Sequence, residues 1–214
     1  MKPIIFNTEM VQAIMDGRKT MTRRVIKPQP AIMANSKPLD GYSDSMIKAA
    51  GDFPTPKYKP GDVLWVRETW RSTDFEYHDG KWTASIQYKD LNKGPRVSWW
   101  DNTDVGEPDD CIYSKTGWRP SIHMPRSAAR LFLKVTDVRV ERVQDISTSN
   151  CEREGITSDI ERFNGHMIPH HDWIVGEFSK LWDSINAKRG YGWDSNPWVW
   201  VYSFKRIGNP GVDA

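Results

Sequence analysis

Residues 17–24 read Gly17-Arg18-Lys19-Thr20-Met21-Thr22-Arg23-Arg24 and bring one amine, two hydroxyls and three guanidinium groups into eight positions. We call this stretch the basic segment. Like charges at close range repel, so four cations on one connection are favoured only where they face water or an anion. A phosphate-bearing partner would supply that anion. A solvated basic turn after a Gly helix stop explains the same residues, and the segment alone does not distinguish the two.

Within the basic segment, Lys19 and Thr22 offer a base and a nucleophile. A threonine hydroxyl is a poor nucleophile unless a base takes its proton. Lys19 can do so if its pKa falls from ~10.4 toward about 7 or 8, and burial beside the neighbouring arginines lowers it. Because positions 19 and 22 lie on opposite faces of an ideal strand, Lys19 must then belong to a turn or a bulge. The third member is a carboxylate from elsewhere in the chain, for which Glu68 and Glu154 are candidates.

Two secondary-structure elements flank the basic segment. Apolar residues recur at helical spacing over residues 8–15, where Thr8 can cap the first turn and Gly17 can end the helix. Residues 20–26 read as an extended segment that ends before Pro28. The basic segment is therefore expected to begin at a helix C-terminus and to continue into a strand.

A second helix is expected to begin within Asp145-Ile146-Ser147 and to end at Glu154 and Gly155. A carboxylate at this position adds negative charge to the negative end of the helix dipole, a penalty that a neighbouring cation must offset. We therefore expect a Lys or Arg side chain near Glu154.

The rest of the chain reads as strands, one further helix and two irregular stretches. Strands are expected over 63–70, in an Asp-Gly hairpin over 77–88, over 131–143 with a bend near 136–137, and over 198–204, with a helix over 172–189. Residues 31–60 and 89–120 combine turn formers without a sustained period, so we expect long surface loops there. Several strands with about three helices favour an α+β fold, a small mixed or antiparallel β-barrel with helices packed at its ends.

Composition narrows the classes of protein that fit. A length of 214 residues suits one domain, and a net charge of +2 argues against a bulk, histone-like nucleic-acid binder. Cys111 and Cys151 have no C-x-x-C partner, which argues against a disulfide scaffold or a zinc ribbon. No apolar run approaches the ~20 residues that span a bilayer, so we expect a cytoplasmic protein with no membrane partner. His166, His170 and His171 lack metal-site spacing, and we expect no metal and no cofactor.

Three ordered motifs resemble those of the ASCH domain family, whose members are relatives of the PUA RNA-binding fold. The motifs are Gly17-Arg18-Lys19-Thr20-x-Thr22-x-Arg24, Pro60-Gly61-Asp62-Val63-Leu64 and Glu154-Gly155. The chain is most similar to the longer phage and prophage members, over residues 2–207, which leaves 208–214 as a tail. The resemblance implies a single domain with a PUA-like β-barrel and flanking helices, loop insertions near 31–60 and 89–120, a cleft beside the Gly-x-Lys loop, and a nucleoside or nucleic-acid ligand.

A small bacterial enzyme of this family hydrolyses N4-acetylcytidine to cytidine and acetate, and it shares the Gly-Arg-Lys-Thr-x-Thr-x-Arg pattern. By this resemblance, Lys19 takes the proton from Thr22, whose oxygen attacks the amide carbonyl. Glu154 holds Lys19 and handles protons for the leaving amine. The resemblance thus implies an amidohydrolase that acts on an acylated nucleoside, with Lys19, Thr22 and Glu154 as catalytic residues.

Five further residues are candidates for binding substrate or RNA. Arg23, Arg24 and Arg126 carry guanidinium groups, whose planar fork suits phosphate or carbonyl oxygens, although each can equally be a structural ion-pair partner. Glu68 and Trp70 follow the apolar part of the expected strand over 63–70. The indole of Trp70 could stack a base or pack inside the barrel.

Three other functions remain open for the same residues. They are a non-catalytic RNA-binding module of PUA type, a ribonuclease that uses the same cleft, and a phage morphogenesis factor whose surface loops contact other proteins. The amidohydrolase requires Glu154 within hydrogen-bond reach of Lys19, whereas an RNA-binding module would spread its cations along an exposed groove.

Overall fold

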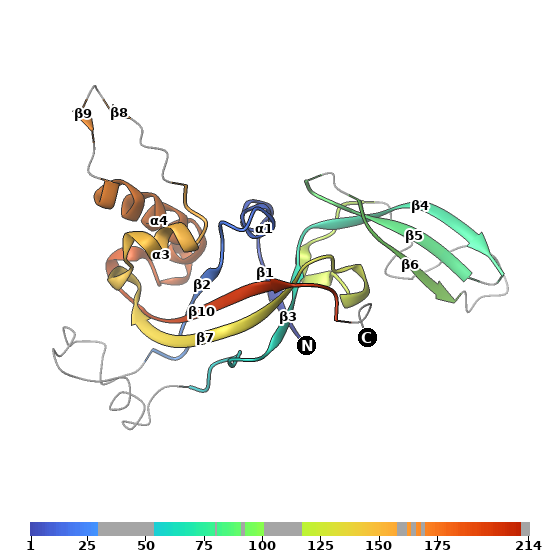
Figure 1. Cartoon of the computed structure of the whole chain (residues 1–214), viewed down its shortest axis with the longest axis horizontal. Helices are drawn as coiled ribbons and strands as arrows, with labels where there is room; N and C mark the ends of the chain where they lie inside the picture. The colour runs from blue at the N-terminus through green and yellow to red at the C-terminus, as the bar shows by residue number, and fades with distance from the viewer. Residues whose placement is uncertain are drawn as a thin grey trace. The chain divides into compact units, whose positions relative to one another are not determined.

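The computed structural model describes residues 1–29, 54–79, 81–90, 93–100, 117–157, 162–163, 166–167 and 170–210. The chain forms two compact units. Unit 1 comprises Met1–Met15, Asp62–Lys134 and Arg206–Ala214, and unit 2 comprises Asp16–Gly61 and Val135–Lys205. Two long strands, β7 (Phe132–Arg142) and β10 (Trp198–Ile207), contribute residues to both units (Figure 1). The number of independent domains stays a prediction.

Among the described residues, unit 1 contains one α-helix, five whole strands and the start of β7. Its elements are β1 (Lys2–Ile5), α1 (Thr8–Met15), β3 (Val63–Arg67), β4 (Trp70–His78), β5 (Lys81–Tyr88), β6 (Lys93–Trp100), the start of β7, and short 3-10 turns at Ser121–His123 and Arg126–Ala128. Strand β1 pairs parallel with β3, and β3 pairs antiparallel with β7. Strands β4, β5 and β6 form a separate antiparallel sheet.

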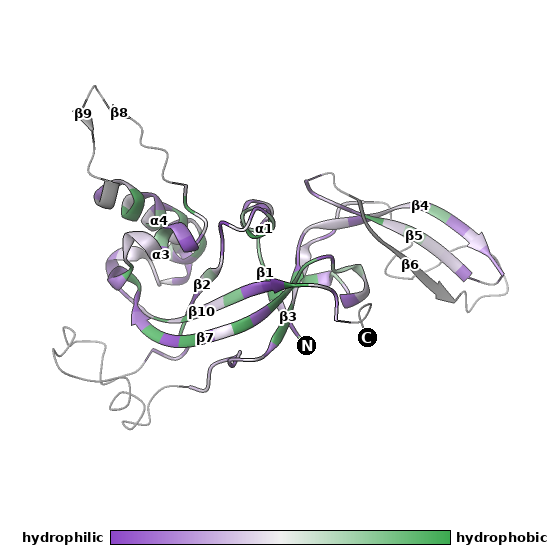
Figure 2. Cartoon of the chain, viewed as in Figure 1, coloured by the Kyte–Doolittle hydropathy of each residue, from purple (hydrophilic) through white to green (hydrophobic). Residues whose placement is uncertain are grey.

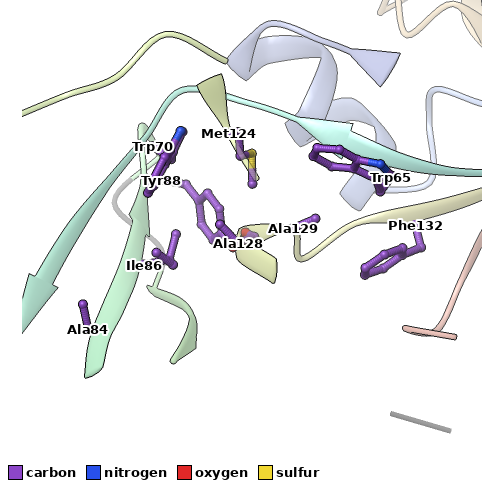
Figure 3. Close-up of a cluster of buried hydrophobic side chains, with 9 residues drawn as sticks. All are labelled: Trp65, Trp70, Ala84, Ile86, Tyr88, Met124, Ala128, Ala129 and Phe132. Carbon is purple, nitrogen blue, oxygen red and sulfur yellow. Dashed lines mark hydrogen bonds between the residues drawn. The ribbon is translucent and has the colours of Figure 1, made fainter. Parts of the chain in front are cut away.

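The core of unit 1 lies between the β4–β5 strands and the segment that carries the two 3-10 turns. Figure 3 shows Tyr88 beside Met124 and Ala128, and the Tyr88 hydroxyl donates a hydrogen bond of 2.7 Å to the Ala128 carbonyl. A buried phenol thereby keeps a polar partner. The buried members of this cluster are Trp65, Trp70, Ala84, Ile86, Tyr88, Met124, Ala128, Ala129 and Phe132.

Unit 2 combines the other end of the long strands with two helices. Its elements are β2 (Met21–Val25), most of β7 and β10, α3 (Thr148–Arg153), β8 (Arg162–Phe163), β9 (His166–Met167), α4 (His170–Asn186), and 3-10 turns at Val143–Asp145, Ala187–Arg189 and Trp193–Ser195. Strand β2 pairs antiparallel with β10. Helices α3 and α4 cover one face of these strands, and the resulting core contains Met21, Val143, Ile146, Cys151, Ile174, Phe178, Trp182, Val199 and Val201.

Five strands are hydrogen-bonded in the order β1-β3-β7-β10-β2, which makes β2 an edge strand among the described residues. Figure 2 shows hydrophobic and hydrophilic residues alternating along β7, as expected for a strand with unlike faces. The α+β class is confirmed, whereas a closed PUA-like barrel stays a prediction. No helix in the described part of the chain is both long enough and apolar enough to cross a membrane.

Most expected elements are confirmed, with two corrections. The expected strand over 63–70 ends at Arg67, and Trp70 begins β4, because the Glu68 N–H bonds to Met124 Sδ and leaves the ladder. The stretch 89–120, expected to be irregular, contains β6, which pairs with β5 despite its Gly94-Pro95 pair. Most of the expected loop over 31–60, residues 101–116 with Cys111, and the end of the tail lie outside the described residues.

Candidate functional site

The basic segment connects α1 to β2 in a conformation that its glycine permits. Helix α1 ends at Met15, and Gly17 has a φ of +79°, a left-handed value that residues with a Cβ rarely adopt. Strand β2 does not begin until Met21, so Lys19 lies in the connection. The requirement that Lys19 belong to a turn is confirmed.

The end of α3 places Glu154 through a Schellman motif. The N–H of Ile156 donates to the Cys151 carbonyl at 3.2 Å and that of Gly155 to the Glu152 carbonyl at 2.8 Å, with Gly155 at a φ of +96°. Glu154 is the last residue in helical conformation before this turn. The expected helix end is therefore confirmed, and its geometry determines where the Glu154 carboxylate begins.

Donors of the basic segment satisfy the last carbonyls of α3. The Thr20 N–H donates to the Arg153 carbonyl at 2.8 Å, Lys19 Nζ to the Glu154 carbonyl at 2.7 Å, and Arg18 Nη1 to the Gly155 carbonyl at 3.2 Å. The final carbonyls of a helix have no partners within the helix, and they carry its negative partial charge. Cationic donors are thus well suited to this position, and they bring the two motifs together.

Lys19 and Glu154 form a buried, hydrogen-bonded pair at this junction. Lys19 Nζ lies 2.6 Å from Glu154 Oε2, and the two residues are only 2% and 5% exposed. Burial lowers the pKa of the Lys19 amine, assisted by Arg24 and Arg23 and opposed by the Glu154 carboxylate. The expectation of a Lys or Arg side chain near Glu154 is confirmed.

Arg23 joins this pair to a second carboxylate. Its Nη1 donates to Glu154 Oε1 at 3.1 Å, and its Nη2 donates to Glu141 Oε2 at 2.8 Å from strand β7. Glu141 in turn accepts a hydrogen bond from Arg139. Glu141 and Arg139 were not among the residues expected at the site. The signal was available, because charged positions 137, 139 and 141 alternate with valines at the period of a strand.

Thr22 faces the side of β2 opposite to Arg23. The register sets Thr22 against Tyr202 and Arg23 against Val201 of β10, and Thr22 is buried. Arg24, which is half-buried, interacts electrostatically with Tyr202, Tyr58 and Glu154, and burial lowers its pKa. Burial raises the pKa of Tyr202 to about 12, so this phenol is neutral near pH 7.

The remaining predicted site residues belong to unit 1. Glu68 is buried and pairs with Arg130, whose Nε and Nη2 donate to the two carboxylate oxygens at 3.0 and 2.7 Å. Trp70 is fully buried in the core of that unit, where base stacking would require the indole to be uncovered. Arg126 is exposed in a 3-10 turn. The carboxylate that meets Lys19 is therefore Glu154.

The arrangement in unit 2 brings the Lys19 amine and the Glu154 carboxylate within hydrogen-bond distance of each other, whereas Thr22 lies on the face of β2 opposite to Arg23. Among the described residues, no group of three His, Cys, Asp or Glu side chains could hold a metal ion. Arg23 and Arg24 are cationic groups close enough to act on the charge state of Lys19.

Neither the protein-family models nor the curated proteins provide a match to this chain. Among solved structures, the crystal structure of protein EF3133 from Enterococcus faecalis V583, family-model DUF984, is similar at a TM-score of 0.43 and 12% identity. The match covers 97% of this chain and 77% of that one. This likeness is distant and carries no argument about activity.

Proposed function

We propose that the chain is an amidohydrolase that removes the acyl group from an N4-acetylcytidine-like nucleoside. The observation that carries the proposal is the 2.6 Å contact between Lys19 and Glu154, in which burial lowers the pKa of the amine. Thr22 lies three positions further along the same segment. The motifs shared with the ASCH family support the same assignment, and with it we propose a PUA-like barrel.

In the proposed reaction, neutral Lys19 takes the proton from Thr22 Oγ1, which attacks the carbonyl carbon of the amide. The C–N bond then breaks, and the amine leaves with the proton returned by Lys19. Lys19 then takes a proton from a water molecule, whose oxygen attacks the carbonyl carbon of the acyl-threonine ester. The ester C–O bond breaks, Thr22 Oγ1 takes the proton back from Lys19, and the carboxylic acid is released. Glu154 orients Lys19 through its hydrogen bond and stabilises the ammonium form that appears during each proton transfer.

Arg24 is the proposed contact for the substrate carbonyl or for a phosphate. It is half-buried on the same face of β2 as Thr22. Arg23 is less suited to this role, since its two terminal nitrogens are hydrogen-bonded to carboxylates of the chain itself. A guanidinium beside the hydroxyl could stabilise the charge that develops on the carbonyl oxygen.

Hydrolysis of N4-acetylcytidine by the purified protein, followed by the change in absorbance of the base, tests the proposal. We expect the Thr22→Ala and Lys19→Ala variants to lose at least about 100-fold in kcat, the scale of acid–base contributions. Thr20→Ala is the matched control, because it removes a neighbouring hydroxyl of the same segment whose oxygen accepts a hydrogen bond from Arg153. Full activity in Thr22→Ala would contradict the assigned nucleophile.

A non-catalytic RNA-binding function is the second candidate, and one feature of unit 1 favours it. The half-buried indole of Trp118 has Arg71 and Lys89 within 4.7 and 4.8 Å of its ring. Aromatic side chains with neighbouring cations are typical of single-strand binding surfaces. Binding of a labelled RNA that is lost in Trp118→Ala, without hydrolysis of any acylated nucleoside by the wild type, would favour this candidate. Cleavage of that RNA, abolished in Lys19→Ala, would instead indicate a ribonuclease.

A further inference from the structure

We propose that Arg23 is a positioning residue: anchored by Glu141, it holds the Glu154 carboxylate against Lys19 and supplies the positive charge that lets this carboxylate lie beside a neutral amine. The inference deepens the proposed function and rests on it, because a neutral amine is what a lysine base requires. The effect of Arg23 on the protonation of Lys19 can be measured without any substrate.

Two contacts fix the orientation of the Glu154 carboxylate. Glu154 uses one carboxylate oxygen for Lys19, at 2.6 Å, and the other for Arg23, at 3.1 Å. Arg23 is itself held from the far side by Glu141, at 2.8 Å, on a different strand. A carboxylate bound through both oxygens has little freedom to rotate. The amine is therefore presented in one orientation, determined by β2, β7 and the end of α3.

The charges around Lys19 balance when its amine is neutral. Arg23 and Arg24 bring two positive charges, and Glu154 and Glu141 bring two negative ones. The four groups are thus neutral together when Lys19 carries no proton, and a proton on Lys19 would add an uncompensated charge to a desolvated site. Without Arg23, Glu154 would have Lys19 as its direct partner and would favour the ammonium form.

Other ionisable groups near the site do not change this balance. Arg139 pairs with both Glu141 and Asp137, outside the buried part of the network. Burial raises the pKa of the Cys151 thiol to about 11, so the thiol stays neutral near pH 7. The phenols of Tyr58 and Tyr202 also have raised pKa values, and the exposed Arg189 acts on Arg24 from the surface.

The side chain of Arg23 lies in an apolar environment that makes its position specific. Its guanidinium is 5.8 Å from the centre of the Phe178 ring, and the side chain is 1% exposed. Among the described residues, none accepts a hydrogen bond from its buried Nε. A buried donor without an acceptor costs free energy. The position of Arg23 therefore optimises its contacts with the two carboxylates and not the total number of its hydrogen bonds.

The test follows Lys19 directly by NMR titration of lysine labelled with ¹³C at Cε, with the signal assigned by its absence in Lys19→Met. We expect Arg23→Gln to raise the titration midpoint by about one pH unit or more, because it removes a nearby cation. Glu141→Gln should lower the midpoint, because Arg23 then gives its whole charge to Glu154. Opposite shifts distinguish charge control from general loosening of the core, which would move both variants alike.

Lys27→Gln serves as the control, since it removes an exposed cation that lies over the Tyr191 ring of the same unit. Its midpoint should match the wild type. Unchanged midpoints in Arg23→Gln and Glu141→Gln, or shifts in the same direction, would overturn the inference. If Arg23→Gln does not fold, the lowered midpoint of Glu141→Gln decides alone.

A pH–rate profile for acylated-nucleoside hydrolysis gives the second readout. The acid limb should move to higher pH in Arg23→Gln and to lower pH in Glu141→Gln. A wild type without turnover but with the expected NMR shifts would reject the proposed function and keep the electrostatic role of Arg23. Turnover by the wild type, with the same titration midpoint and the same acid limb in the variants, would keep the proposed function and reject the electrostatic role of Arg23.

Discussion

Lys19 Nζ and Glu154 Oε2 are 2.6 Å apart, although 135 positions separate the two residues in the chain. Both side chains are buried, and both lie where a helix end meets a strand start. Lys19 Nζ also donates to the Glu154 backbone carbonyl, so both the backbone and the side chain of Glu154 hold the amine in place.

The pH dependence of stability should report the state of Lys19. Burial lowers its pKa below the ordinary 10.5, so the unfolded chain binds more protons than the folded one between the lowered value and 10.5. The contribution of Lys19 to the free energy of unfolding should therefore become more favourable as pH rises through this window, by up to about 1.4 kcal/mol per pH unit. Urea unfolding of wild type and Lys19→Met at several pH values measures it. An equal pH dependence in the two proteins would refute the prediction, and Lys27→Met is the control.

Removal of the Glu154 carboxylate should destabilise the protein strongly. In Glu154→Ala, the buried Arg23 cation loses one of its carboxylate partners and Lys19 loses its side-chain hydrogen-bond acceptor, and leaving a buried charge without its partner costs about 3–5 kcal/mol. Glu152→Ala, an exposed change in the same helix, should cost less than about 1 kcal/mol. Denaturant midpoints measure both, and similar values for the two variants would count against a role for the buried pair.

Two glycine-to-alanine substitutions should change the stability of the protein in opposite directions. Gly155 ends α3 at a φ of +96°, so Gly155→Ala strains the turn and should cost about 1–2 kcal/mol. Gly176 lies inside α4, where an added Cβ meets nothing within 4 Å, so Gly176→Ala should stabilise the protein by about 0.5–1 kcal/mol. Thermal unfolding of the two variants checks the signs. Stabilisation by Gly155→Ala would mean that the helix end is built differently.

Trp70 should behave as a core residue. It is fully buried, and truncation of a buried indole costs about 3–5 kcal/mol, so Trp70→Ala should lose that amount of stability. Tyr77, at the other end of β4, is 49% exposed, and Tyr77→Ala should cost far less. Urea unfolding compares the two. A small loss in Trp70→Ala would restore the idea of an accessible stacking platform.

Local signals in the sequence predict the parts that frame the site. The helix stop at Gly17, the Ser147 cap and the turn at Gly155 all depend on residues within a few positions of one another, and the structure contains each of them. The cation near Glu154 follows from the same local reasoning about the helix dipole. These features need no knowledge of the rest of the fold.

Interactions between distant segments account for what was missed. The break after Arg67 depends on Met124, 57 positions away, and β6 exists because β5 pairs with it. Glu141 contacts Arg23 only because the fold brings β7 near β2, and no local sequence pattern predicts that proximity. The division into two compact units is likewise a matter of tertiary contacts.

The last carbonyls of α3 accept hydrogen bonds from residues 18–20, more than 130 positions earlier in the chain. The site therefore depends on contacts between residues that are far apart in sequence. The loop-closure entropy of such a contact is lost before its hydrogen bonds form, which delays it during folding. The amine and the carboxylate come from the two separate sequence stretches of unit 2, so neither stretch contains the pair by itself. A nascent or truncated chain that lacks the second stretch has no acid for its lysine, so competence for chemistry arrives together with the completed unit.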